Sequence, residues 1–164
     1  MLIDMRRFNR SVLNSLSLLS LIVLIAMLFL SADLFANDAL IVQRSDGVAV
    51  QFEVEYARDA ATHRRGLMGR DHLDQRSGMF FDFRRTQPIR MWMKHTLIPL
   101  DILFVAESGA IVYIARNTTP LSLDVIEAAE PVRYVLEINA EETQELGITL
   151  GDRVLLDAAR SAQH

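Results

Sequence analysis

In residues 48–57, with the sequence VAVQFEVEYA, large apolar side chains at every second position alternate with Ala49, Gln51, Glu53 and Glu55. Successive side chains of a β-strand point to opposite faces, so this pattern predicts a strand with one buried face and one face in water. Further β-type runs occur at 39–44, 78–83, 89–95, 100–106, 110–115, 134–139 and 151–156. Turn signals such as Ser45-Asp46-Gly47 separate these runs. The chain is therefore expected to build a sheet with many turns.

Two short helices are expected between these strands. The first spans about 60–65, because Asp59 suits the N-cap and Gly66 suits the position after the last turn. The second begins after Asn139 and Glu142, whose spacing is that of a capping box, and is ended by a glycine. About seven short strands and little helix predict a mainly β (α+β), single compact, barrel-like domain, because closure buries one face and removes exposed edges.

The N-terminus has the pattern of an export signal. Arg6, Arg7 and Arg10 precede an uncharged run at 11–32. Cleavage of a signal peptide after Ala36 is the favoured interpretation. The alternative is a retained inner-membrane anchor through residues 11–32, since about 20 apolar residues suffice to span a bilayer. Both interpretations divide the chain into 1–36 and a domain at 37–164, and both predict a periplasmic domain because basic flanks stay cytoplasmic.

Composition excludes several classes of protein. The chain has no cysteine, which rules out disulfides, thiol catalysis, thiolate metal sites and a lipoprotein anchor. Of its 17 basic and 21 acidic residues, three arginines and two aspartates precede residue 37, so the domain keeps 14 basic and 19 acidic residues. An acidic domain of this kind is a poor nucleic-acid binder. No nucleic-acid partner and no cofactor are expected.

Residues 89–101, IRMWMKHTLIPLD, contain the only tryptophan, Trp92, and the only lysine, Lys94. If 89–96 is a strand, Arg90, Trp92 and Lys94 share one face. Cations on both sides of an indole ring can bind an anionic or ring-shaped ligand. The competing interpretation is that arginine and lysine stems pack over a surface tryptophan and shield it.

The opposite face of the same strand would carry Met91, Met93 and His95. Thioether and imidazole donors in a row can hold Cu(I) in an exported protein without cysteine. Methionine is also a common filler of hydrophobic cores, so packing is the competing interpretation. A periplasmic Cu(I) binder is one alternative function, and no metal ligand is assigned.

Two carboxylates, Asp101 and Glu137, each stand between apolar residues of a predicted strand. Buried carboxylates need partners, and the available cations are Lys94, Arg65, Arg70 and Arg90. One interpretation is a structural ion pair between Lys94 and Asp101. The other is a pocket at the barrel mouth lined by Lys94, Asp101 and Glu137, with Trp92 at its rim. The candidate ligand-binding residues are Trp92, Lys94, Asp101, Glu137 and Arg70.

Catalytic motifs are weak in this chain. Asp101 and Glu137 together can serve a small periplasmic hydrolase of the glycosidase type. No serine lies in a nucleophile-elbow sequence, and no HExxH metal motif occurs. No catalytic residue is assigned, and the sequence does not favour an enzyme.

Five blocks resemble, in order, those of the family known as domain of unknown function 192, DUF192: RGLMGR (65–70), GMFFDF (78–83), MWMKHTLIPLDILFV (91–105), YVLEINA (134–140) and GITLGDRV (147–154). The resemblance covers roughly 48–156. His95 stands where the family typically has asparagine, and Glu141 where glycine is usual. The resemblance implies a small, mostly β, often exported domain and no particular reaction. The resulting prediction is an extracytoplasmic binding or accessory module for a small anionic or ring-containing ligand, with no protein partner identified.

Overall fold

The computed structural model describes residues 38–156. The predicted export segment at 1–36 lies outside this range, so its cleavage or retention stays a prediction. The elements follow in the order β1 (Asp38–Gln43), β2 (Ala49–Ala57), α2 (Ala60–Arg65), β3 (Ser77–Gln87), β4 (Arg90–Met91), β5 (Leu100–Val105), β6 (Ile111–Ala115), β7 (Ile126–Glu127), β8 (Val132–Asn139), α3 (Glu142–Glu145) and β9 (Arg153–Leu155). No helix within the described range is long and apolar enough to cross a bilayer.

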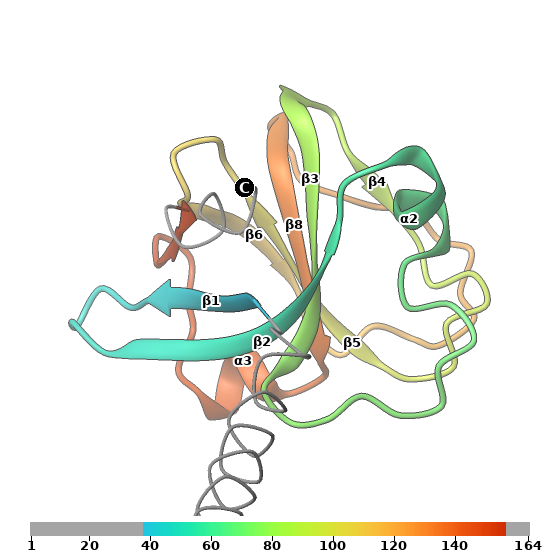
Figure 1. Ribbon diagram of the computed structural model, residues 1–164, viewed down its shortest axis with the longest axis horizontal. Helices are drawn as coiled ribbons and strands as arrows, with labels where there is room; N and C mark the ends of the chain where they lie inside the picture. The colour runs from blue at the N-terminus through green and yellow to red at the C-terminus, as the bar shows by residue number, and fades with distance from the viewer. Residues whose placement is uncertain (1–37, 157–164) are drawn as a thin grey trace, which may run out of the picture. The chain divides into compact units, whose positions relative to one another are not determined.

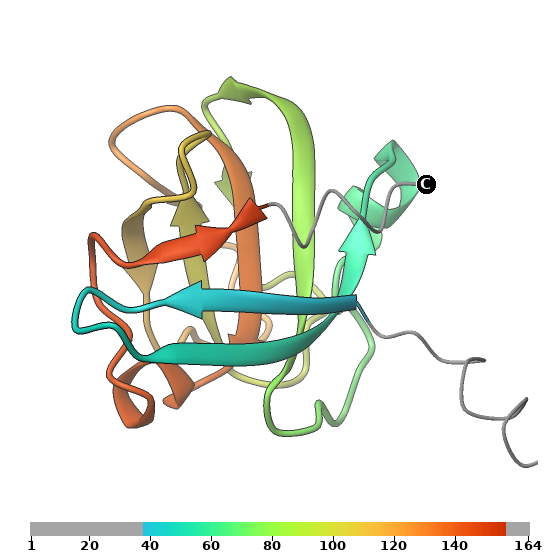
Figure 2. The same ribbon diagram turned by 60° about the vertical axis from the view of Figure 1, so that its left-hand side comes forward.

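Seven strands form one curled sheet in the order β6-β5-β8-β3-β2-β1-β9, while β4 and β7 form a separate pair. Figures 1 and 2 show the sheet bending round on itself. Its two ends meet at a single bridge between Ala110 and Arg153, beside which the Ile111 amide donates to the Asp152 carbonyl at 2.8 Å. The predicted mainly β, barrel-like domain with two short helices is confirmed, and its sheet is a half-barrel.

β2 and β3 run parallel, whereas every other neighbouring pair of the large sheet is antiparallel. Parallel neighbours cannot be joined by a tight hairpin, so the chain must cross one face of the sheet between them. Residues 58–76 make this crossover and include α2. At the start of β3, Gly78 permits close approach of β8, because a Cβ there would overlap the carbonyl oxygen of Glu137.

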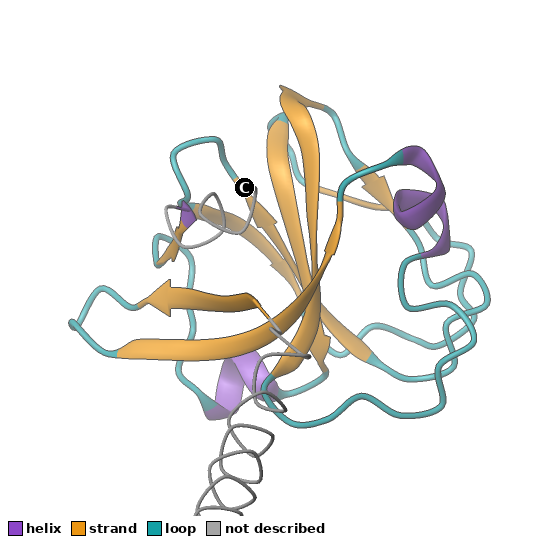
Figure 3. Cartoon of the chain, viewed as in Figure 1, coloured by secondary structure: helices purple, strands orange, loops and turns teal. Residues whose placement is uncertain are grey.

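The sheet buries apolar side chains on both faces. A cluster on the inner side of the curl includes Phe80, Leu103 and Leu136. A second cluster on the outer side of β3, β5 and β8 includes Phe81 and Ile102. In Figure 3, α2 and the loops at the right cover that outer side. β5 is consequently buried at every position, whereas β2 shows the predicted alternation of buried and exposed residues.

The first predicted helix is confirmed as α2. The Asp59 side chain accepts hydrogen bonds from the Ala61 and Thr62 amides, and the Thr62 side chain completes a capping box. Gly66 follows the last turn with a positive φ of 47°, a conformation that glycine adopts at little cost. The sequence therefore defines both ends of this helix.

The second predicted helix forms as α3, but its predicted capping box is wrong. The N-cap is Glu141, whose φ of 73° lies in the left-handed region and whose side chain makes no capping bond. Asn139 instead donates to the carbonyl of Leu73 at 3.1 Å. Glu142 accepts from the Arg76 amide at 2.8 Å. Both side chains bind residues at the end of the crossover, which passes beside α3. The spacing of Asn139 and Glu142 in the sequence does not reveal this distant neighbour.

Candidate functional site

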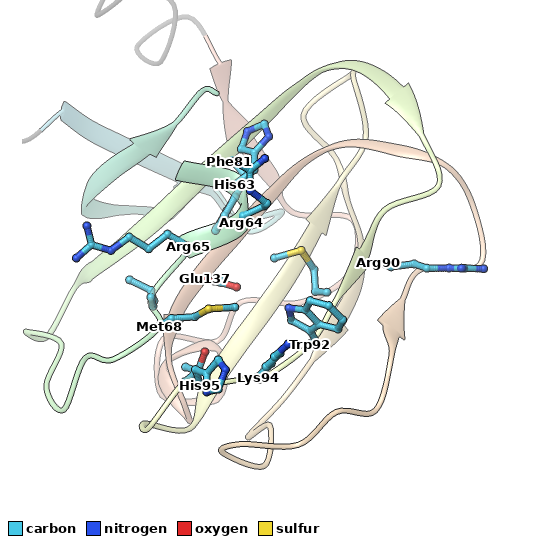
Figure 4. A pocket seen from close by; sticks show the side chains of 14 residues that line it. His63, Arg64, Arg65, Met68, Phe81, Arg90, Trp92, Lys94, His95 and Glu137 are labelled. Carbon is cyan, nitrogen blue, oxygen red and sulfur yellow. The ribbon is translucent and has the colours of Figure 1, made fainter. Parts of the chain in front are cut away.

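A cavity of about 450 Å³ lies against the outer face of β3 and β8. Its walls are the end of α2 with the residues that follow, and β4 with the loop after it. Phe81 of β3 and Glu137 of β8 line the cavity from the sheet. Figure 4 shows Glu137 in the middle of the site, with Met68, Lys94 and Trp92 around it. The pocket therefore lies outside the barrel and not at its mouth, where it was predicted.

The wall that carries Lys94 is a turn rather than the predicted strand at 89–95. β4 ends at Met91, and the Thr96 amide donates to the Met93 carbonyl at 3.0 Å to close the turn. His95 has a φ of 58° in this turn, where asparagine or glycine is most easily accommodated. The His95 carbonyl accepts from the Gly69 amide at 2.8 Å. This hydrogen bond joins the turn to the segment after α2 and so links the two walls of the cavity directly.

Glu137 is the buried acid of the site. It is paired with Met79 of β3 and Ile102 of β5, so its side chain lies on the outer face with theirs. Only 5% of the residue is exposed, and within the described range its Oε2 atom has no hydrogen-bond partner. Burial raises the pKa of Glu137 to about 8. The side chain is therefore mostly a neutral carboxylic acid at pH 7, able to donate one hydrogen bond.

The space beside this acid depends on Gly66. A Cβ at that position would lie 3.7 Å from Glu137 Oε2 and 3.5 Å from the Phe81 ring. The helix C-cap thus places backbone without a side chain beside the acid. A ligand in the cavity could supply the partner that this buried oxygen lacks within residues 38–156, which makes the cavity a candidate site.

The rim of the cavity is aromatic and cationic. Trp92 is 50% exposed, and Lys94 Nζ lies 5.4 Å from the centre of its ring, within cation–π range. Arg64, Arg65 and Arg90 also line the cavity. Arg90 binds Glu127 at 3.0 Å, and Figure 4 shows Arg65 and Arg90 pointing away from the centre. Arg64 and Lys94 remain as cations of the site, and Lys94 is the one that lies against the exposed Trp92 ring.

Asp101 belongs to a different part of the molecule. Its neighbour Ile102 shares the outer face with Glu137, so Asp101 points to the inner face. There it accepts hydrogen bonds from the amide of Asn117 at 2.8 Å and from the amide and hydroxyl of Thr143 at 3.0 and 2.5 Å. The predicted Lys94–Asp101 pair is wrong, because the acid is satisfied by these donors. The two carboxylates of the hydrolase alternative lie on opposite faces and cannot act on one bond.

Arg70 also lies outside the cavity. Its guanidinium binds Glu55 at 2.6 Å, and that interaction raises the pKa of Arg70. The prediction that Arg70 belongs to the ligand site is therefore not supported by its position. Of the five candidate residues, the structure brings together Trp92, Lys94 and Glu137.

The row of donors proposed for Cu(I) does not form. Met93 is 1% exposed, and its sulfur accepts a hydrogen bond from the Thr118 hydroxyl at 3.2 Å. Met91 and His95 line the cavity instead. The strand on which the row depended ends at Met91, so the three side chains do not share a face. Residues 38–156 also contain no group of three or more histidine, aspartate and glutamate side chains placed to hold a metal ion.

Sequence reasoning missed the contribution of the crossover to the site. His63, Arg64, Gly66 and Met68 all line the cavity. The Nε2 atom of His63 donates a hydrogen bond to the Ala57 carbonyl at 3.0 Å, which fixes its ring over the sheet. The available signal was the RGLMGR block, which begins where α2 ends.

Comparison with known proteins agrees with this fold. The sequence profile of DUF192, described as "Uncharacterized ACR", matches residues 41–156. A candidate transcription regulator from Sinorhizobium meliloti has a similar crystal structure, with 41% identity, a TM-score of 0.70, and coverage of 71% of this chain and 91% of that one. A protein of unknown function from Novosphingobium aromaticivorans is similar at 37% identity and a TM-score of 0.68, covering 71% of this chain and 83% of its own. Comparison with curated proteins gave no match. The chain therefore belongs to the DUF192 family, as the sequence blocks indicated.

Proposed function

We propose that this chain is an exported binding module whose outer-face cavity holds a small ligand with an apolar or ring-shaped body and an anionic group. The observation that carries the proposal is the convergence of Glu137, Lys94 and Trp92 on one cavity. Ligand sites are typically concave and mostly apolar, with a few polar groups that fix orientation. This cavity combines a buried acid whose Oε2 atom has no hydrogen-bond partner among the described residues, a half-buried cation and an exposed indole.

Charge favours an anionic ligand. Four positively charged side chains line the cavity against the single carboxyl group of Glu137, namely Arg64, Arg65, Arg90 and Lys94. Arg65 and Arg90 point away from its centre and Arg90 is paired with Glu127, so Arg64 and Lys94 are the cations left for a ligand. The carboxyl of Glu137 is mostly neutral at pH 7, since burial raises its pKa to about 8. The remainder of the domain is acidic, so this concentration of cations is local. A local cationic cleft in an acidic protein attracts anions and raises their local concentration.

Binding is favoured over catalysis by the contents of the cavity. Glu137 is its only carboxyl group, and Asp101 on the opposite face does not supply a second. A hydrolase of the glycosidase type needs two carboxyl groups on either side of the bond that breaks. The same lining contains no serine or cysteine to act as a nucleophile.

The periplasmic location rests on the sequence of residues 1–36, with their basic start and apolar run. An alkaline phosphatase reporter fused after His164 is expected to be active in cells. N-terminal sequencing of the same product separates cleavage after Ala36 from a retained anchor. A stable but inactive fusion would contradict export.

Binding can be tested on residues 37–164 expressed alone. The matched crystal structure from Sinorhizobium meliloti has 91% of its chain inside the similarity, so a domain of this fold folds without the N-terminal segment. A panel of small aromatic and aliphatic anions should raise the thermal midpoint, because a ligand that prefers the folded state stabilises it. Lys94→Met should abolish the shift, while Arg70→Met, which removes a cation outside the cavity, should preserve it. Equal shifts in both variants would exclude this cavity as the site.

A further inference from the structure

We infer that the ligand of this cavity carries two recognised groups: an anionic group held at the rim by Lys94, and a neutral hydrogen-bond acceptor at the far end of its apolar body, held by Glu137. This inference rests on the proposed function and specifies the ligand class. Carbonyl, ether and ring-nitrogen acceptors all fit the second requirement. The argument depends on where the cations and the buried acid lie in the cavity.

The inner end of the cavity is suited to a neutral group. Glu137 Oε2 is buried beside the Phe81 ring and the backbone of Gly66. An anion placed there would lose its hydration without gaining a contact to a cation, which is a large penalty. A neutral acceptor would instead give Oε2 the partner that it lacks within the described range, and an unmade buried hydrogen bond is costly.

The outer end is suited to the anion. Lys94 is half-buried in its turn and lies against the exposed Trp92 ring, so it can pair with an anion that keeps part of its hydration. The other charged or titratable groups that line the cavity are His63, Arg64, Arg65, Arg90 and His95. All of these are bases, so Glu137 is the only lining group that can become negative. Between the two ends, Phe81, Met91 and Trp92 supply apolar surface for the body of the ligand.

The arrangement links binding to the protonation of Glu137. Burial raises the pKa of this carboxyl to about 8, so it donates a hydrogen bond at neutral pH and loses that proton in mildly basic solution. An ionised Glu137 would repel both an acceptor atom and the anion. The preference for a ligand with the acceptor should therefore disappear as the pH rises past this pKa.

Isothermal titration calorimetry with three probes tests the inference: benzoate, which has the anion and ring; 4-acetylbenzoate, which adds a carbonyl acceptor opposite the anion; and acetophenone, which has the carbonyl without the anion. At pH 6.5, 4-acetylbenzoate should bind about tenfold more tightly than benzoate, the factor expected for one buried hydrogen bond. At pH 9 both anions should bind more weakly, and 4-acetylbenzoate should have lost its advantage over benzoate. Acetophenone should bind more weakly than 4-acetylbenzoate at both values.

Variants assign the effect to Glu137. Glu137→Gln retains a hydrogen-bond donor that does not titrate, so the tenfold preference should persist at both pH values. Glu137→Leu retains the shape but removes the donor, so the preference should vanish at both. Equal affinities of the two anions for the unmodified domain at pH 6.5, or an unchanged preference in Glu137→Leu, would overturn the inference while leaving anion binding intact. Failure of both anions to bind would overturn the proposed function itself.

Discussion

Replacing Glu137 with glutamine should change how the stability of the domain depends on pH. The pKa of this carboxyl is about 8 in the folded domain, compared with about 4.5 when it is in water. Between these values the folded state holds a proton that the unfolded state has released, so stability falls as pH rises. Each pKa unit corresponds to about 1.4 kcal/mol, so the full loss approaches about 5 kcal/mol. Below pH 4.5 the loss is absent, and above pH 8 it is complete.

Glu137→Gln removes this titration and keeps the shape of the side chain. Urea unfolding of residues 37–164 at several pH values between 4.5 and 9 measures the free energy of unfolding of both proteins. The free energy of unfolding of the variant, relative to that of the unmodified domain, should increase by about 1.4 kcal/mol for each pH unit between 4.5 and 8. Glu130→Gln, the same change on an exposed side chain, is the control. Its free energy of unfolding should depend on pH in the same way as that of the unmodified domain. Parallel profiles for Glu137→Gln as well would show that Glu137 titrates normally and would refute the argument for a neutral buried acid.

Three further substitutions test other features of the structure, each by urea unfolding. Glu141→Gly should stabilise the domain by about 1 kcal/mol, because glycine adopts the left-handed conformation at the N-cap of α3 with less strain than glutamate. A destabilised variant would contradict the left-handed conformation of residue 141. Asp101→Ala should cost about 3 kcal/mol or more by leaving the Thr143 and Asn117 donors without an acceptor, yet ligand binding should survive in the folded fraction. Gly78→Ala should lower the free energy of unfolding by about 1–3 kcal/mol, because its methyl group would displace β8 at the Glu137 carbonyl. An unchanged free energy of unfolding would show that β3 and β8 are not in close contact there.

Local features of the fold were predictable from the sequence. Asp59 and Gly66 define α2 because capping depends on residues only a few positions apart. The alternation in 48–57 identifies β2 because only one of its faces is covered. The continuous apolar runs in β3 and β5 indicate strands buried on both faces, because such strands lose their alternation.

The composition of the site was only partly predictable. Glu137 and Asp101 look alike in sequence, since each is a carboxylate between apolar neighbours, yet the register of β5 against β8 sends them to opposite faces. Register depends on the pairing of strands far apart in the chain, which one sequence does not reveal. Arg70 was grouped with the site by charge, but the crossover carries it to Glu55 instead.

The two departures from the usual family residues have a common physical explanation. His95 and Glu141 both have positive φ values, 58° and 73°. Asparagine and glycine, which the resemblance implies at these two positions, enter this region at lower cost than most residues. Histidine shares part of that tolerance, so the turn beside Lys94 is little strained, whereas glutamate at 141 bears the full cost. The resemblance thus located two backbone positions that periodicity alone does not mark.

The parallel pairing of β2 with β3 also has a kinetic consequence. The two strands cannot be joined by a local turn, so they pair only when the crossover at 58–76 lies across the outer face. The same crossover supplies one wall of the cavity, so the cavity is complete only when β2 and β3 have paired. A ligand bound there stabilises the native state more than the transition state for folding. It should therefore slow the unfolding of the domain and leave its folding rate almost unchanged.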